Sequence, residues 1–202
     1  MLEGLDGAGT TTQAQRLATW MMARGRRVHL TAEPSRGPIG TQVRHVLSGR
    51  LRGPGGGAFD ARSLALLFAA DRLDHWGSEI DPRLEEGCDV ISDRYVLSSL
   101  AYQAVSTGDA RWVAAINSMA PAPDLTIFLR VAPAVALRRR FAASAEREIF
   151  EFPDFQRKVH RAYLRALAGM VGAGERVVDI RGEGAIEVVG DAVTRSVEPL
   201  LP

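Results

Sequence analysis

The chain has little of several things that define whole classes of protein. Among its 202 residues there is one cysteine, Cys88, and one lysine, Lys158. A single cysteine excludes an intramolecular disulfide framework, and this favours a reducing compartment. The sequence contains no apolar run of the ~20 residues that a membrane-spanning helix needs, and no signal-type segment precedes the first glycine. These absences predict a cytoplasmic protein with no membrane partner.

Net charge is also nearly absent, because 25 basic residues oppose 24 acidic ones and leave +1. Proteins that hold nucleic acid through its phosphates typically have a strongly basic surface, so we expect no nucleic acid partner. With 46% hydrophobic residues, the chain is long enough for one filled core and too short for two ordinary domains. We therefore predict a single domain over residues 1–202.

The most informative motif is the run from Gly4 to Thr11, which fits the phosphate-binding loop G-x-x-x-x-G-K-[ST] at every fixed position except one. The exception is Thr10, which stands where such loops have lysine. Glycines in this loop let backbone N–H groups close around phosphate oxygens. The run therefore predicts a nucleotide phosphate site that lacks the usual ammonium group. The residues predicted to hold the nucleotide are Gly4, Leu5, Asp6, Gly7, Ala8, Gly9, Thr10, Thr11 and Thr12.

Short apolar runs and helical stripes alternate along the rest of the chain. Residues 27–31, 88–92, 125–129 and 176–180 are typical of strands, and helical patterns lie at 14–21, 60–76, 133–141 and 155–171. Only residues 1–3 precede the glycine loop, so we expect a shortened first strand. This order predicts an α/β fold, a three-layer sandwich with a five-stranded parallel sheet of the P-loop NTPase type and helices on both faces.

Asp93 and Arg94 directly follow the strand predicted at 88–92. Open α/β sheets bind ligands at the carboxyl ends of their strands, so both side chains are candidates for a ligand site. The Asp93 carboxylate and the Thr11 hydroxyl are predicted to hold Mg²⁺, and Arg94 is predicted to make a bidentate contact with a phosphate. The alternative is an internal ion pair between an aspartate and Arg94 that only fixes the loop.

Phe68 and Arg72 lie one turn apart in the helix predicted at 60–76. Together they offer a flat ring and a fork of donors, a combination suited to stacking on a base and hydrogen-bonding its edge. The alternative for Phe68 is an ordinary core position.

Together these motifs resemble the thymidylate kinase family of P-loop nucleoside monophosphate kinases. The similarity covers Glu3 to Gly9, the pair Glu33-Pro34 with the downstream Arg44, and the run Leu66 to Arg72. The most specific match is the run from Asp93 to Gln103, which fits the family signature D-R-[YH]-x-x-S-x-x-A-Y-Q. The resemblance runs nearly end to end.

The resemblance implies transfer of the γ-phosphate of ATP to dTMP, with Mg²⁺ as cofactor, and a homodimer. It implies that Asp6 contacts the 3′-hydroxyl of dTMP, that a lid lies at about 142–148, and that Asp6, Arg94 and Arg147 are the catalytic residues. Candidates for the dimer surface are Leu64, Leu67 and the helix at 43–47. The implied dTMP-binding residues are Glu33, Arg44, Phe68, Arg72, Arg94, Ser99, Tyr102 and Gln103.

The sequence departs from the family where ATP phosphates are expected. Besides Thr10, the lid reads A-A-S-A-E-R where the family has R-G-x-x-D-R, so that only Arg147 remains. Three functions stay open at this point. They are a working dTMP kinase in which arginines beside the lid offset the missing lysine, a nucleotide-binding protein without activity, and a kinase for another nucleoside or nucleotide.

Overall fold

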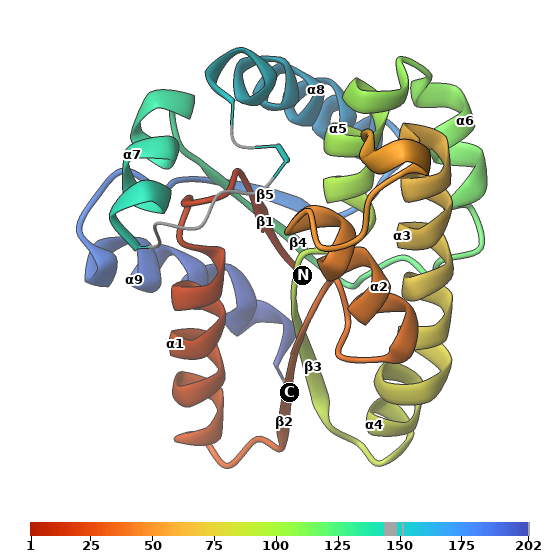
Figure 1. The fold of residues 1–202 in the computed structure, drawn as a ribbon. Helices are drawn as coiled ribbons and strands as arrows, with labels where there is room; N and C mark the ends of the chain where they lie inside the picture. Colours follow the sequence, from red (N-terminus) through yellow and green to blue (C-terminus); the bar gives the residue numbers. More distant parts are fainter. Residues whose placement is uncertain (144–148, 151, 202) are drawn as a thin grey trace.

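The fold is a parallel sheet between two layers of helices (Figure 1). The computed structural model describes residues 1–143, 149–150 and 152–201. Within these residues, five strands pair in parallel in the order β2-β3-β1-β4-β5. The strands are β1 (Leu2–Gly4), β2 (Val28–Ala32), β3 (Asp89–Asp93), β4 (Thr126–Arg130) and β5 (Val177–Arg181).

Helices cover both faces of this sheet. On one face α1 packs against α9 and against strands β1 to β3; on the other face α5 contacts β1, α8 contacts β5, and α3 packs on α5. The helices are α1 (Thr10–Met22), α2 (Pro38–Leu47), α3 (Ala61–His75), α4 (Asp81–Glu85), α5 (Val96–Thr107), α6 (Ala110–Ile116), α7 (Pro133–Ala143), α8 (Pro153–Gly172) and α9 (Ile186–Val197), with short turns η1 (Pro54–Gly56), η2 (Trp76–Ile80) and η3 (Glu198–Leu200).

The central strand β1 is the short one, as expected. It pairs with β4 at three positions and with β3 only at Leu2 opposite Asp93. Because the strands are parallel, the residues that follow β1 and β3 meet at one edge of the sheet, where the glycine loop and Arg94 lie. The register of the sheet thus brings the two main motifs of the sequence together.

The predicted α/β sandwich is confirmed, with small shifts at the ends of its elements. Helix α3 starts where predicted because the Asp60 side chain accepts a hydrogen bond from the Ser63 amide at 2.7 Å, which caps the helix. Helix α2 starts earlier than the apolar pattern indicated, at Pro38, a residue suited to a first helical turn. The single domain over residues 1–202 stays a prediction.

No helix within the described residues has both the length and the apolar character that crossing a membrane requires. The longest of them, α8, carries charged residues along its exposed side.

Candidate active site

The glycine loop joins β1 to α1, as the motif predicted. Gly7 and Gly9 have φ angles of 85° and 96°, a left-handed region that favours glycine. The Ala8 amide closes the turn on the Leu5 carbonyl at 2.8 Å, and α1 begins at Thr10. The first-turn amides of α1 have no side-chain cap from Gly9, so the helix start is a ready site for anionic groups.

A pocket of about 620 Å³, here called the loop pocket, lies in front of this turn. Its lining includes residues 6–13, so Asp6, Gly7, Ala8, Gly9, Thr10, Thr11 and Thr12 lie where the motif placed them. Leu5 is instead a core side chain, 1% exposed, and Gly4 has no room for a side chain because Ala8 Cβ is 2.9 Å from where its Cβ would be. Gly4 and Leu5 therefore shape the loop without lining the loop pocket.

Thr11 and Asp93, the two residues predicted to hold Mg²⁺, lie in contact with each other. The Thr11 hydroxyl donates a hydrogen bond to Asp93 Oδ2, while the buried Oδ1 of Asp93 has no hydrogen-bond partner. A hydroxyl and a carboxylate with a spare oxygen are the donors that Mg²⁺ prefers, so these residues fit the ion. Histidine, cysteine and carboxylate side chains form no cluster of three or more around a possible metal in the part of the chain that the structure describes.

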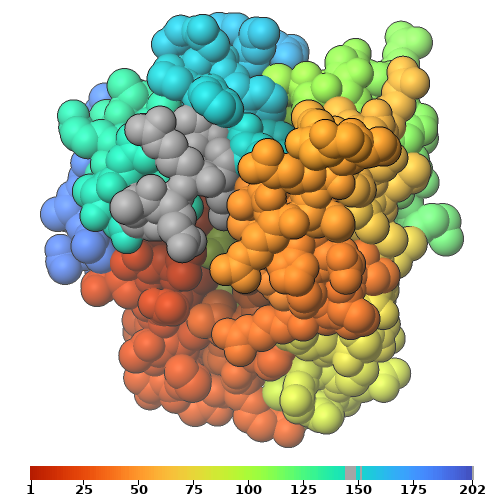
Figure 2. Space-filling model, viewed as in Figure 1, coloured from red at the N-terminus to blue at the C-terminus, as the bar shows by residue number. Residues whose placement is uncertain are grey.

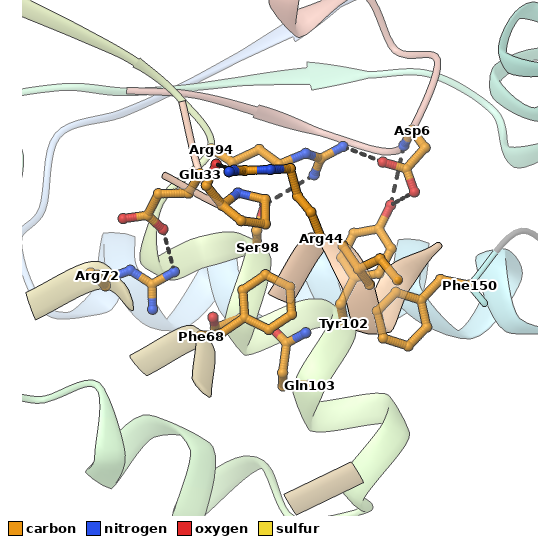
Figure 3. Close-up of a pocket in the computed structure, with 13 residues that line it drawn as sticks. Asp6, Glu33, Arg44, Phe68, Arg72, Arg94, Ser98, Tyr102, Gln103 and Phe150 are labelled. Atoms are coloured by element: carbon orange, nitrogen blue, oxygen red, sulfur yellow. Dashed lines mark hydrogen bonds and ion pairs between the residues drawn. The ribbon is translucent and has the colours of Figure 1, made fainter. Parts of the chain in front are cut away.

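A second pocket of about 240 Å³, here called the side pocket, lies between α2, α3 and α5 (Figures 2 and 3). In Figure 2 the orange surface of the α2 region lies across a hollow from the red surface of α1. The structure brings together here every residue that the resemblance assigned to the monophosphate. These are Glu33, Arg44, Phe68, Arg72, Arg94, Ser99, Tyr102 and Gln103, together with Asp6.

Asp6 and Arg94 line both pockets and lie between them. Arg94 donates to Asp6 Oδ1 at 2.6 Å, and the Tyr102 hydroxyl donates to Asp6 Oδ2 at 2.9 Å (Figure 3). Although burial opposes its charge, Arg94 has a pKa well above the ordinary value, chiefly because of the Asp6 carboxylate. The ion pair of Arg94 is therefore with Asp6 rather than with its neighbour Asp93, and it holds a permanent cation between the two pockets.

The buried Glu3 side chain helps to hold Arg94 in place through Ser98. Glu3 is 0% exposed; its Oε1 accepts hydrogen bonds from the amides of Tyr95 and Ser98, at 2.8 and 3.1 Å. Its Oε2 accepts from the Ser98 hydroxyl at 2.6 Å. Arg94 in turn donates to Ser98 Oγ and to the Tyr163 hydroxyl, at 3.0 and 3.2 Å. This network fixes the start of α5 and the direction of the Arg94 guanidinium.

Burial raises the pKa of Glu3 from its ordinary 4.5 to about 7, against the opposing effect of these hydrogen bonds. The folded protein thus binds a proton at Glu3 more tightly than the unfolded chain does. The contribution of Glu3 to the free energy of unfolding should be greatest below pH 4.5 and should be lost as the pH rises through about 7, a loss of up to about 3 kcal/mol.

Glu3→Gln should remove this pH dependence, since the amide cannot ionise. In urea titrations from pH 4.5 to 8, the variant should gain stability relative to the natural protein as the pH rises, with the change complete just above pH 7. Glu86→Gln, which alters an exposed carboxylate paired with Arg83, is the control and should show no such trend. A stability difference between the Gln variant and the natural protein that stays constant over this range would mean that Glu3 is ionised throughout.

The far end of the side pocket is polar and buried. Arg72, 1% exposed, donates to Glu33 Oε2 at 2.6 Å and to Asn117 Oδ1. The Arg72 Nε, the Glu33 Oε1 and the Ser99 Oγ are buried without a hydrogen-bond partner. Phe68 and Gln103 line the same pocket beside them. The pocket thus places one flat ring beside polar side chains, a combination suited to stacking on a base and hydrogen-bonding its edge.

Arg44, which lines the side pocket, is held by two backbone carbonyls and one side-chain hydroxyl. It donates to the Pro34 carbonyl at 3.0 Å, to the Ser35 carbonyl, and to Thr41 Oγ1 at 3.0 Å. Arg44 lines the side pocket, and its role in binding the substrate stays a prediction.

Two other predictions have different outcomes. Arg147 and most of the lid predicted at 142–148 lie outside the described residues, whereas 142 and 143 belong to α7. The expected dimer surface is wrong at Leu64 and Val43, which are 3% and 0% exposed within the core of a single chain. Their apolar spacing reflects the packing of α2 on α3 and of α3 on α5. The homodimer itself stays a prediction, and so does Leu67 as part of its surface.

Three residues of the site were not predicted. Ser98, the serine of the signature itself, binds both Glu3 and Arg94. Phe150 lines the side pocket, with its ring 5.7 Å from that of Tyr102 and stacked on Phe155 at 5.1 Å. The Tyr163 hydroxyl comes from α8. Only Ser98 carried a signal in the sequence.

Known proteins resemble the chain over most of its length. The family model described as thymidylate kinase matches residues 2–191. A probable thymidylate kinase of Pyrobaculum calidifontis is 44% identical over 193 residues, which cover 95% of this chain and 92% of that protein. A probable thymidylate kinase of Pyrococcus horikoshii is 41% identical over 165 residues, 82% of this chain and 80% of the relative. One of Thermococcus onnurineus is 38% identical over 193 residues, 95% and 91% of the two chains.

Proposed function

Since this chain belongs to the thymidylate kinase family, we propose that it transfers the γ-phosphoryl group of ATP to the phosphate of dTMP. The observation that carries this proposal is the meeting of two pockets at Asp6 and Arg94. One pocket is bounded by a phosphate-binding loop, and the other by an aromatic ring and polar groups suited to a nucleoside. A phosphoryl group passing between them must pass Arg94.

In the proposed reaction, a phosphate oxygen of dTMP forms a bond to the γ-phosphorus of ATP. The bond from that phosphorus to the bridging oxygen breaks, so the products are dTDP and ADP. Such transfers depend on positioning and on neutralising charge. Arg94 would hold the acceptor phosphate, and Asp6, fixed by Arg94 and Tyr102, would accept a hydrogen bond from the 3′-hydroxyl.

The glycine loop would bind the phosphates of the donor, ATP. Its backbone amides and the start of α1 would bind the β- and γ-phosphates. Thr11 and Asp93 would hold Mg²⁺, which when bound neutralises phosphate charge. The loop contributes no ammonium group, because position 10 is threonine.

The proposal is tested by dTDP formation from dTMP and ATP with Mg²⁺, followed by chromatography, with dUMP, dCMP and dGMP as competing acceptors. Turnover that prefers dTMP supports the function. Calorimetric binding of dTMP without any turnover would instead favour the nucleotide-binding protein, and turnover that prefers another monophosphate would favour a kinase of different specificity.

Phe68→Ala should raise the KM for dTMP by about tenfold and change kcat much less, because stacking on a base contributes about 1–3 kcal/mol. Steady-state kinetics at saturating ATP measure both constants. Leu66→Ala is the matched control, since Leu66 is on the same helix but 50% exposed. An unchanged KM in the Phe68 variant would mean that Phe68 does not stack on the base and is an ordinary core residue.

A further inference from the structure

Helix α3 turns three buried polar side chains toward the end of β2 and the segment that follows it. Each contacts one residue of this segment, and the contacted residues alternate along the chain. The pairs are His75 with Thr31, Arg72 with Glu33, and Asp71 with Ser35. The middle pair lines the side pocket (Figure 3), whereas His75 does not. His75 is therefore a buried, ionisable group to which the proposed function gives no role.

The His75 ring faces the Glu33 carboxylate. Its Nδ1 lies 3.6 Å from Glu33 Oε1, and within the described residues neither of these buried atoms has a hydrogen-bond partner. Its Nε2 lies 2.7 Å from Thr31 Oγ1 and 3.7 Å from Glu79 Oε2. A buried polar atom without a partner costs free energy, and a movement of about half an ångström brings Nδ1 and Oε1 to hydrogen-bond distance. The two atoms therefore fit each other as donor and acceptor.

The carboxylates around His75 favour its charged form. Burial opposes the charge, but Glu33, Glu79 and Asp71 together raise the pKa of His75 above its ordinary 6.5. An imidazolium carries a proton on each ring nitrogen, so that Nδ1 can donate to Glu33 while Nε2 donates to Thr31. In this state His75 has a donor for the oxygen of Glu33 that Arg72 does not use.

We propose that His75 is a positioning residue for the recognition of dTMP: it holds the Glu33 carboxylate through Oε1, and Glu33 holds Arg72 at the polar far end of the side pocket. The inference deepens the proposed function and rests on it for the substrate. Without a donor at His75, Glu33 Oε1 stays buried and unsatisfied, the carboxylate turns toward other donors, and Arg72 loses its fixed direction. The loss falls on the KM for dTMP rather than on kcat, because the acceptor phosphate is assigned to Arg94.

Two conservative variants test the two ring nitrogens separately, because the amide nitrogen of asparagine replaces Nδ1 and that of glutamine replaces Nε2. His75→Asn keeps a donor for Glu33 and should leave the KM for dTMP within about threefold of the natural value. His75→Gln lacks this donor and should raise the KM about tenfold, with kcat changed by less than about threefold. The same two substitutions at His45, an exposed residue of α2 that lines neither pocket, are controls and should leave both constants unchanged. Equal KM values for the two His75 variants, or the reverse order, would overturn the proposal.

A double variant tests whether the effect passes through Glu33. In a Glu33→Gln background the carboxylate is already gone, so His75→Gln should raise the KM for dTMP by less than about twofold more. If the two losses instead multiplied, His75 would act on the pocket by another route and the proposal would be wrong.

Nuclear magnetic resonance of the natural protein, with ¹⁵N in its histidines, tests the same contact without any variant of a buried residue. Ring nitrogens with and without a proton differ in chemical shift, and we expect His75 Nδ1 to carry a proton at pH 7. A bare Nδ1 would overturn the proposal, because it has nothing to donate to Glu33.

Calorimetry with dTMP separates this proposal from the function on which it rests. His75→Gln should bind dTMP about tenfold more weakly than the natural protein, whether or not the natural protein turns dTMP over. Equal affinities in the two proteins would overturn the role of His75 alone. A natural protein that binds no dTMP would overturn the proposed function, and with it the substrate assigned to this contact.

Discussion

Arg94→Gln is expected to lower kcat/KM for dTMP by about 1,000-fold, because it removes the one guanidinium that, among the described residues, lines both pockets. The loss has two parts. The acceptor phosphate loses a charged, bidentate partner, and the Asp6 carboxylate loses the counter-ion that lies 2.6 Å away. An uncompensated carboxylate at this point repels both substrates.

Arg94→Lys should recover only part of this activity. An ammonium restores the charge but cannot reach Asp6, the Gly4 carbonyl and Ser98 together, as the forked guanidinium does. Arg83→Gln is a control on an exposed arginine paired with Glu86, remote from either pocket, and should leave kcat/KM unchanged. If Arg94→Gln stayed within tenfold of the natural protein, Arg94 would not contact the phosphate in transfer.

The sequence predicted those parts of the site whose geometry is determined within one short segment of the chain. The glycine loop needs a fixed spacing of glycines before a helix, and the run from Asp93 to Gln103 places a strand end and the first turns of α5 in one stretch. The side chains at Arg94, Ser99, Tyr102 and Gln103 then reach the same pocket because they share one helix start. Local spacing was sufficient for these residues.

Two of the residues that were missed, Phe150 and Tyr163, lie far from the predicted motifs in the chain. Tyr163 reaches Arg94 from 69 positions further along the chain, and nothing in the stripe of α8 distinguishes it from a core tyrosine. Phe150 precedes α8 in a connection without periodicity. Such contacts depend on how helices pack, and packing is not encoded in the spacing of a single segment.

The ends of the strands were also predicted imprecisely. Strands β3, β4 and β5 each end at a polar residue, Asp93, Arg130 and Arg181, one position beyond the apolar runs that predicted them. Backbone pairing continues there regardless of side chain: the Glu33 amide, for example, donates to the Asp93 carbonyl at 3.0 Å. Hydrophobic pattern marks the buried part of a strand, whereas hydrogen bonding sets its length.

Gly7→Ala is expected to destabilise the protein by about 4 kcal/mol, from two causes that add. The φ of 85° disfavours any side chain, and the new methyl group would lie 2.1 Å from the Ala136 carbonyl oxygen. Real contacts of this kind need about an ångström more, so the loop and α7 must move apart. Urea denaturation followed by circular dichroism measures the change in the free energy of unfolding.

Gly9→Ala isolates the contact with α7 from the backbone cost. Gly9 has a similar φ of 96°, but a Cβ there meets nothing within 4 Å. This variant should therefore lose only about 1 kcal/mol. If Gly7→Ala lost no more than Gly9→Ala, the close packing of α7 on the loop would not exist in solution.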